Sequence, residues 1–357
     1  MVGSIIVFIL ILGGLVFAHE LGHFWLAKRQ GIKVEEFGLG FPPRLWSVQK
    51  GETVYSLNLI PFGGFVKIFG ENGEEETRPD SFASKTIWQR AKVLAAGVTM
   101  NLVLAFVLLF IGYLTGLPSL VSKEDSSLKQ VRIVEVTAGS PAQEAKLEVG
   151  DILLEIGSGA AFLEIKKAED VSEFTFAHQG EELTLKIKRG NRIENVRVTA
   201  RSQTVAGQGA LGIAVGNVGK MVLPWYQALY EAFISVFYLC YLILGAIVRF
   251  LADLITGSGD TSQISGPIGI YSLTSQASKM GLAYLLQFAM FLSVNFAVVN
   301  LLPFPALDGG RLLFLLVEKI KGSPISRKLE SKIHAGGFAV LILLMIAITL
   351  RDVYNLL

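Results

Sequence analysis

The chain has little charge and almost no cysteine. Of its 357 residues only 17% are charged, the net charge at pH 7 is +2, and the single cysteine, Cys240, lies in an apolar segment. One cysteine excludes an internal disulfide, and no Lys/Arg cluster alternates with aromatic residues, which argues against a nucleic-acid partner. With 52% hydrophobic residues and a mean hydropathy of +0.52, the sequence predicts a polytopic α-helical membrane protein with soluble parts.

Five apolar runs are long enough to cross the hydrocarbon core of a bilayer. They cover residues 4–27, 92–117, 226–252, 284–306 and 333–350. The first run has no small-residue cleavage site, so we expect it to be retained. Between the second and third runs, residues 122–204 alternate apolar and polar side chains, as in Val131–Val134 and Leu183–Ile187. This alternation predicts β-strands in a small soluble domain.

Two of the four histidines stand four residues apart at the end of the first run. They are His19 and His23 in Phe17-Ala18-His19-Glu20-Leu21-Gly22-His23. On a helix both imidazoles can reach one metal ion, while Glu20 projects beside them to activate water. Such residues are costly in hydrocarbon. The pattern therefore favours a zinc-protease site over polar side chains that merely lie at the membrane interface.

Basic residues predict the orientation in the membrane. Residues 28–92 and 318–332 are rich in Lys and Arg, whereas 253–283 has only Lys279 with Asp253 and Asp260. The first two segments are therefore expected in the cytoplasm and the third outside, which allows four crossings among five runs. We expect 226–252 to lie along the outer membrane surface as a helix. The run 284–306 then passes inward and brings position 308 to the depth of the histidines.

Asp308 is the candidate third ligand, since a catalytic zinc needs three protein ligands and an open position. It follows Asn300, Pro303 and Pro305, and prolines in an apolar helix are tolerated where freed backbone groups line a cavity or meet a partner. Asn300 could donate a hydrogen bond to substrate. In the expected mechanism one zinc ion activates water, and Glu20 takes its proton and passes it to the leaving amine.

Residues 37–70 predict a membrane-associated β-hairpin loop. Arg44–Val48 and Thr53–Leu57 alternate around a Lys50-Gly51 turn, and Gly63 and Gly64 lead into a further apolar run. A helical substrate must unwind before hydrolysis, and a strand edge in this loop could pair with its backbone. Gly63 and Gly64 are therefore candidate substrate-binding residues. The alternative is an ordinary cytoplasmic hairpin that braces the helices.

Together these segments resemble the site-2 protease family of intramembrane zinc metalloproteases, of the regulator-of-sigma-E protease (RseP) type. The matching segments are Phe17–Lys28, Gly38–Gly64, Ser265–Ile270 and Asn295–Gly310. The resemblance implies that His19, His23 and Asp308 bind zinc, that Glu20 is catalytic, and that Asn300, Pro303 and Pro305 support substrate binding. It also implies a bacterial cytoplasmic (inner) membrane enzyme. Its substrates would be single-span proteins already shortened by an upstream site-1-type protease, such as anti-sigma factors or signal-peptide remnants.

Part of the soluble stretch is similar to a PDZ domain. Ala138–Leu153 looks like its helix and Gly-Asp turn, and binding of peptide termini or a role as a spacer both remain open. The chain departs from the family in two ways. It has room for one PDZ domain rather than two, and Gly97-Val98-Thr99-Met100-Asn101 stands where members often have Gly-Pro before an asparagine. His178 and His334 lack ligand-spaced neighbours and are expected to be structural.

The expected architecture combines four transmembrane helices, the hairpin loop and the surface helix with one inserted extracytoplasmic PDZ-like β/α domain. Its expected parts are the first membrane half (1–121), the PDZ-like domain (122–204), a linker with the surface helix (205–283) and the second membrane half (284–357). A zinc-binding membrane transporter is the alternative, although it gains nothing from Glu20, which is not a ligand. A PDZ membrane scaffold would leave the buried histidines unexplained.

Overall fold

The computed structural model describes residues 2–71, 77–120, 130–137, 139–159, 161–190, 192–202, 209–256, 266–323 and 325–354. Ala138, Asp260 and Ser265, which belong to segments discussed above, lie outside the described residues. The chain forms two compact units. The first, the membrane unit, contains Met1–Ile111, Tyr226–Ser275 and Leu286–Leu357, and the second, the β unit, contains Gly112–Trp225 and Gln276–Leu285.

The described residues include five helices that are long and apolar enough to cross a membrane. They are α1 (Val2–Arg29), α2 (Ile87–Thr115), α5 (Trp225–Thr256), α7 (Leu282–Leu301) and α9 (Arg327–Tyr354), and each covers all or most of one predicted apolar run. Large apolar side chains point outward, with Leu10 at 68% and Leu343 at 67% exposure. Such surfaces suit lipid rather than water. The chain is therefore a polytopic membrane protein with an inserted β domain.

Two shorter helices, α6 (Pro267–Met280) and α8 (Asp308–Lys321), belong with these five. At the start of α6, Asp352 of α9 accepts hydrogen bonds from the backbone N–H groups of Gly266 (2.9 Å) and Gly269 (3.0 Å). A carboxylate is stabilised at this position because a helix N-terminus has unpaired N–H donors and a positive dipole. The Gly-Pro-Ile-Gly segment singled out from the sequence thus anchors the end of α9.

The sheet of the membrane unit is built from two long strands, β1 (Val34–Lys50) and β2 (Thr53–Ile68). The first part of β1 pairs with two parts of β2, because Gly38 is opposite both Ser56 and Phe65. The rows therefore lie in the order 64–68, 34–39, 53–58 and 44–50. The pairing predicted for 44–48 with 53–57 is confirmed, and the 64–68 row forms the opposite edge of the sheet.

The β unit contains a seven-stranded sheet. Six of its strands lie side by side in the order β3-β9-β4-β5-β7-β8, and the seventh, β6, pairs with β5. Its strands are β3 (Leu117–Leu120), β4 (Gln130–Val136), β5 (Ile152–Ser158), β6 (Ala161–Glu164), β7 (Glu182–Arg189), β8 (Arg192–Thr199) and β9 (Ile213–Met221), with helices α3 (Pro141–Glu144) and α4 (Ala168–Ala177). The strands predicted at 131–134 and 183–187 are confirmed as β4 and β7. Two strands, β3 and β9, lie outside the range 122–204, because four residues with a proline and a strand with two glycines give little alternation.

Candidate metal centre

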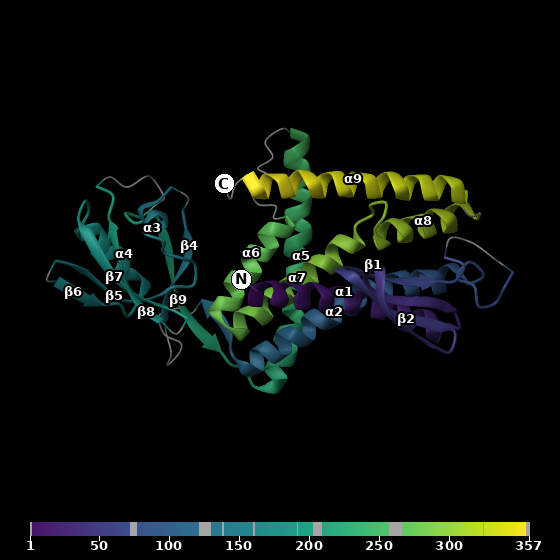
Figure 1. Cartoon of the computed structure of the whole chain (residues 1–357), viewed down its shortest axis with the longest axis horizontal. Helices are drawn as coiled ribbons and strands as arrows, with labels where there is room; N and C mark the ends of the chain where they lie inside the picture. The colour runs from purple at the N-terminus through teal and green to yellow at the C-terminus, as the bar shows by residue number, and fades with distance from the viewer. Residues whose placement is uncertain are drawn as a thin grey trace. The chain divides into compact units, whose positions relative to one another are not determined.

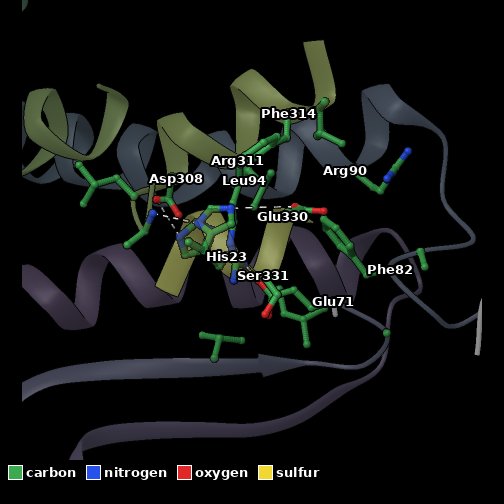
Figure 2. Close-up of a pocket in the computed structure, with 18 of the residues that line it drawn as sticks. His23, Glu71, Phe82, Arg90, Leu94, Asp308, Arg311, Phe314, Glu330 and Ser331 are labelled. Carbon is green, nitrogen blue, oxygen red and sulfur yellow. Dashed lines mark hydrogen bonds and ion pairs between the residues drawn. The ribbon is translucent and has the colours of Figure 1, made fainter. Parts of the chain in front are cut away.

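Helix α1 and the start of α8 bring three side chains together. His19 and His23 are buried, and their Nε2 atoms lie 3.2 Å apart. Asp308 Oδ2 lies 3.0 Å from His19 Nε2 and 3.3 Å from His23 Nε2. In Figure 2 the carboxylate of Asp308 points at the imidazole of His23. Residues from opposite ends of the chain thus form one group able to hold a metal ion.

The chemistry of these three atoms fits a cation. The Nδ1 atom of His23 lies 2.8 Å from the Val93 carbonyl oxygen, which can only accept, so Nδ1 carries the hydrogen and Nε2 of the neutral ring has a free lone pair. That lone pair faces Asp308 Oδ2, a buried atom that has no hydrogen bond of good geometry among the described residues. Tetrahedral zinc ligands with bonds of roughly 2.0–2.1 Å lie about 3.3 Å apart. The observed separations are close to this value.

Tight backbone packing positions Asp308. A Cβ atom on Gly309 would overlap the carbonyls of Leu301 and Leu302, and one on Gly310 would overlap the Phe304 carbonyl. The loop before Asp308 places Ala306 at a φ of 75°, and its N–H donates to His334 Nδ1 over 2.9 Å. His334 therefore supports the loop that leads to Asp308. No spacing in the sequence pointed to this contact.

Helix α2 supplies the other partners of the histidines. The carboxamide of Asn101, whose exposure is 0%, lies 3.0 Å from His19 Nδ1, and the Val93 carbonyl holds His23. From the sequence, Asn101 is expected only as a structural match to the family's asparagine. No sequence pattern predicts the Val93 contact, because it is made by a main-chain carbonyl and does not depend on residue type.

Glu20 and the edge strand line the same cavity as the metal-binding group. This cavity has a volume of about 1260 Å³, and its lining includes His19, Glu20, His23, Asp308 and the segment Gly64–Val66 of β2. A Cβ atom on Gly64 would lie 3.3 Å from Glu20 Cγ, so the strand approaches Glu20 closely because Gly64 has no side chain. Gly63 adopts a φ of 102° and adjoins Phe41, and only glycine takes this conformation readily.

The far part of the cavity is lined by charged groups that fasten α8. Arg311 forms an ion pair with Glu71, just beyond the end of β2. Arg90 of α2 pairs with Glu318, and both side chains are only 16% exposed. Figure 2 shows Arg90, Glu71 and Arg311 around this part of the cavity. These ion pairs connect α8 to the segment after β2 and to α2, and no sequence pattern predicts either pair.

Three predicted substrate-binding residues, Asn300, Pro303 and Pro305, are not among the described residues that line the cavity. Asn300 donates from Nδ2 to the Phe296 carbonyl of its own helix (2.9 Å). Pro305 packs where Gly337 of α9 leaves room, and Pro303 lies in the same loop. In the β unit, His178 Nδ1 hydrogen-bonds to the Phe174 carbonyl oxygen (2.9 Å) and its ring stacks on Phe174. Its contacts are those of a residue packed in a fold.

Comparison with known proteins adds independent information. The model of peptidase family M50 matches residues 7–344. The regulator of sigma-W protease RasP of Bacillus subtilis (strain 168) is 31% identical, and the similarity covers 99% of this chain and 99% of that protein. The zinc metalloprotease RasP of Bacillus licheniformis is 32% identical, with the same coverage of both chains. The similarity thus extends over the membrane unit and the β unit.

Proposed function

Because the chain belongs to peptidase family M50 and is a zinc metalloprotease of the site-2 type, we propose that it hydrolyses peptide bonds within the spans of single-span membrane proteins. One observation carries the proposal. The group of His19, His23 and Asp308, with Glu20 beside it, lies on and next to a helix that is long and apolar enough to cross a membrane. A hydrolytic site built into such a helix is suited to substrates that are themselves in the bilayer.

In this proposal His19, His23 and Asp308 hold the zinc ion. Bound zinc supplies Lewis-acid activation of water and of the scissile carbonyl. Glu20 takes the proton of the attacking water and later gives it to the leaving amine. Its place in the cavity, one residue after His19 and against Gly64, supports this role.

The 64–68 edge is the proposed docking strand for substrate. A substrate helix hides its carbonyls in internal hydrogen bonds, and an added strand would hold the unwound backbone extended. Gly64 lines the cavity beside Glu20, and Gly63 sets the turn into this strand. The apolar side chains of Leu45, Leu59 and Ile60 on the same sheet are 60%, 54% and 44% exposed, which suits a loop that enters lipid. Asn300 uses one Nδ2 hydrogen to bond the Phe296 carbonyl. Its Oδ1 atom and its second Nδ2 hydrogen would contact the substrate.

We further propose that four helices cross the membrane and that α5 lies on its outer surface. The basic segments 28–92 and 318–332 support cytoplasmic placement of both. In Figure 1, α5 runs crosswise to α1 and α9. This helix carries three exposed tyrosines, Tyr226 (56%), Tyr230 (65%) and Tyr241 (72%). Tyrosine is enriched at membrane interfaces. Single cysteines at positions 258 and 326, in a Cys240→Ser background, test this with an impermeant thiol reagent. Labelling at 326 but not at 258 would reverse the topology.

The proposed cellular role is regulated intramembrane proteolysis in a bacterial cytoplasmic membrane. The name of the Bacillus subtilis relative refers to regulation of a sigma factor, so an anti-sigma factor shortened by an upstream protease is a suitable substrate class. Signal-peptide remnants are a second suitable kind of substrate, since they too are single membrane-spanning segments. The purified protein should cleave a substrate that has been pre-cut outside the membrane faster than the uncut form. Equal rates would show that cleavage by an upstream protease is not required first.

The central experiment separates the base from the ligands. Purified Glu20→Gln should retain zinc, measured by metal analysis, but lose cleavage of a model single-span substrate by roughly 10²–10⁴-fold, since only proton transfer is lost. Asp308→Ala should lose both zinc and cleavage. Appreciable proteolysis by Glu20→Gln would exclude it as the base, and full zinc occupancy in Asp308→Ala would exclude that ligand.

A further inference from the structure

We propose that one face of α2 is a template that orients both histidine ligands, with Asn101 as the positioning residue for His19. The inference rests on the proposed function, because it assumes that His19 and His23 bind zinc. Three positions of α2 at intervals of four, Val93, Gly97 and Asn101, lie on one face of a helix. Each of them meets the histidine pair.

The first position fixes His23. The Val93 carbonyl oxygen accepts from Nδ1 over 2.8 Å, and a carbonyl cannot donate, so Nδ1 keeps its hydrogen. The Nε2 lone pair of His23 then points toward Asp308. Because the partner is a main-chain atom, no substitution of Val93 would remove this contact directly.

The second position makes room for both rings. A Cβ atom on Gly97 would lie 2.8 Å from Cε1 of His19 and 2.8 Å from Cε1 of His23, and it would overlap His23 Nε2. Real Cβ contacts do not occur at such distances. Any side chain at this position would therefore push the imidazoles out of place, and only glycine lets α2 pass this close to them.

The third position must act on His19 through its side chain. For Nε2 of His19 to bind zinc, its Nδ1 must carry the hydrogen and meet an acceptor. The partner 3.0 Å away is the Asn101 carboxamide, whose Nδ2 lies toward the ring. A half-turn of that group presents Oδ1 instead. The turn breaks no hydrogen bond at the other end, because Oδ1 has no partner there among the residues that the structure describes.

The burial of Asn101 leaves no substitute for its carboxamide. Its exposure is 0%, so solvent water cannot replace the acceptor. Ser293 of α7 donates to the backbone oxygen of Asn101 over 2.8 Å. That bond holds the helix position and does not involve the carboxamide, so Ser293→Ala is a matched control for packing at the same place.

The test measures metal affinity in the full-length protein in detergent, within a Glu20→Gln background that prevents self-cleavage. Zinc affinity is determined by competition with a chromophoric chelator, and cobalt substitution reports ligand geometry through its visible absorption bands. Asn101→Leu should raise the zinc Kd by about 10–100-fold, the usual effect of losing the hydrogen-bond partner of a metal-bound histidine. Asn101→Asp, whose carboxylate accepts in either orientation, should bind zinc at least as tightly as the parent protein. Ser293→Ala should change the Kd by less than about threefold.

Each outcome decides the inference. Parental zinc affinity and an unchanged cobalt spectrum in Asn101→Leu would overturn it, as would equal losses in the Leu and Asp variants, which would indicate packing alone. If Asn101→Leu does not fold, Asn101→Ala is compared with Asn101→Asp in the same way. His19→Ala must lose zinc in this assay. If it keeps zinc, the proposed metal site fails, whereas a zinc-free His19→Ala with a parental Asn101→Leu rejects only the template.

Discussion

Both units bury apolar side chains, but the membrane unit also buries a polar cluster beneath an apolar surface. Inside the membrane unit lie His19, His23 and Asn101, while large apolar side chains cover its surface. Inside the β unit lie Leu183, Leu185 and Ile187, each 0% exposed. The contrast shows how the solvent of each unit sets the meaning of polarity. A polar residue is ordinary on the surface of the β unit, whereas in a membrane span it requires a partner and indicates function.

Each unit also contains an acid whose side chain is largely shielded from solvent, and the two acids have different partners. Asp151 of the β unit is 2% exposed and receives hydrogen bonds from Arg189 Nε (2.7 Å) and from a terminal Arg189 nitrogen (2.6 Å). These bonds raise the pKa of Arg189. Asp308 has instead two imidazole nitrogens within 3.3 Å. Asp151 is therefore neutralised by Arg189, a cation within the chain itself. Asp308 faces imidazoles that carry no charge when neutral, so a bound metal ion would supply the cation.

Metal removal should produce the largest difference between the units. Dialysis against a strong chelator should lower cleavage of a single-span substrate by at least ~10³-fold, since the Lewis-acid contribution is worth several kcal/mol. Added zinc should restore it. Hydrogen exchange of the β unit should stay unchanged, because its buried charge has a protein partner. Faster hydrogen exchange in both units after chelation would show that the metal stabilises the whole chain.

Arg189→Ala should have the next largest effect, confined to the β unit. It leaves Asp151 buried without its cation, which should lower the free energy of unfolding of that unit by about 3 kcal/mol. Hydrogen exchange of β5 and β7 reports the change, and zinc content reports the membrane unit. Unaltered exchange would mean that water solvates Asp151 readily. A fall in zinc content would mean that the units are energetically coupled.

Excision of the β unit tests whether it screens substrates by size, a role that would follow from the extracytoplasmic placement expected from the sequence. The ladder from Leu117↔Met221 to Leu120↔Val218 joins β3 to β9, so replacing residues 122–216 by a short Gly/Ser joint retains it. A compact domain of this size is roughly 25 Å across. Cleavage of short-tailed substrates should stay within about twofold, and substrates with folded ectodomains should become cleavable. Loss of short-tail cleavage in a zinc-loaded deletion would indicate capture of substrate termini instead.

Lys166→Ala should have the smallest effect and serves as the reference for the others. Its partner Glu164 is 3.3 Å away, and the two side chains are 75% and 72% exposed. Exposed pairs of this kind contribute little because water screens them. The free energy of unfolding of the β unit should change by less than about 0.5 kcal/mol, and a larger change in thermal unfolding would contradict this.

The sequence predicts those features that depend on repeated local patterns. The long apolar runs identify five helices, alternation identifies β4 and β7, and the spacing of His19 and His23 identifies their shared helix face. The folding of β1 and β2 into four rows was not predictable, because it depends on positive φ angles at Gly40 and Gly63 rather than on periodicity. The contacts of Val93, Arg311 and His334 were also missed. They join residues distant in sequence through a carbonyl, an ion pair and a loop N–H, none of which has a sequence pattern.

The distance along the chain between the histidines and Asp308 has a consequence for biosynthesis. Roughly 290 residues separate them, and at about 5–20 residues per second a ribosome needs about 15–60 s to synthesise that interval. Helix α2, by contrast, follows the histidines by fewer than a hundred residues. A nascent chain therefore contains the α2 partners of both imidazoles long before it contains the carboxylate. A chain that ends before Asp308 cannot assemble the complete site, so proteolysis must wait until synthesis and insertion have passed that residue.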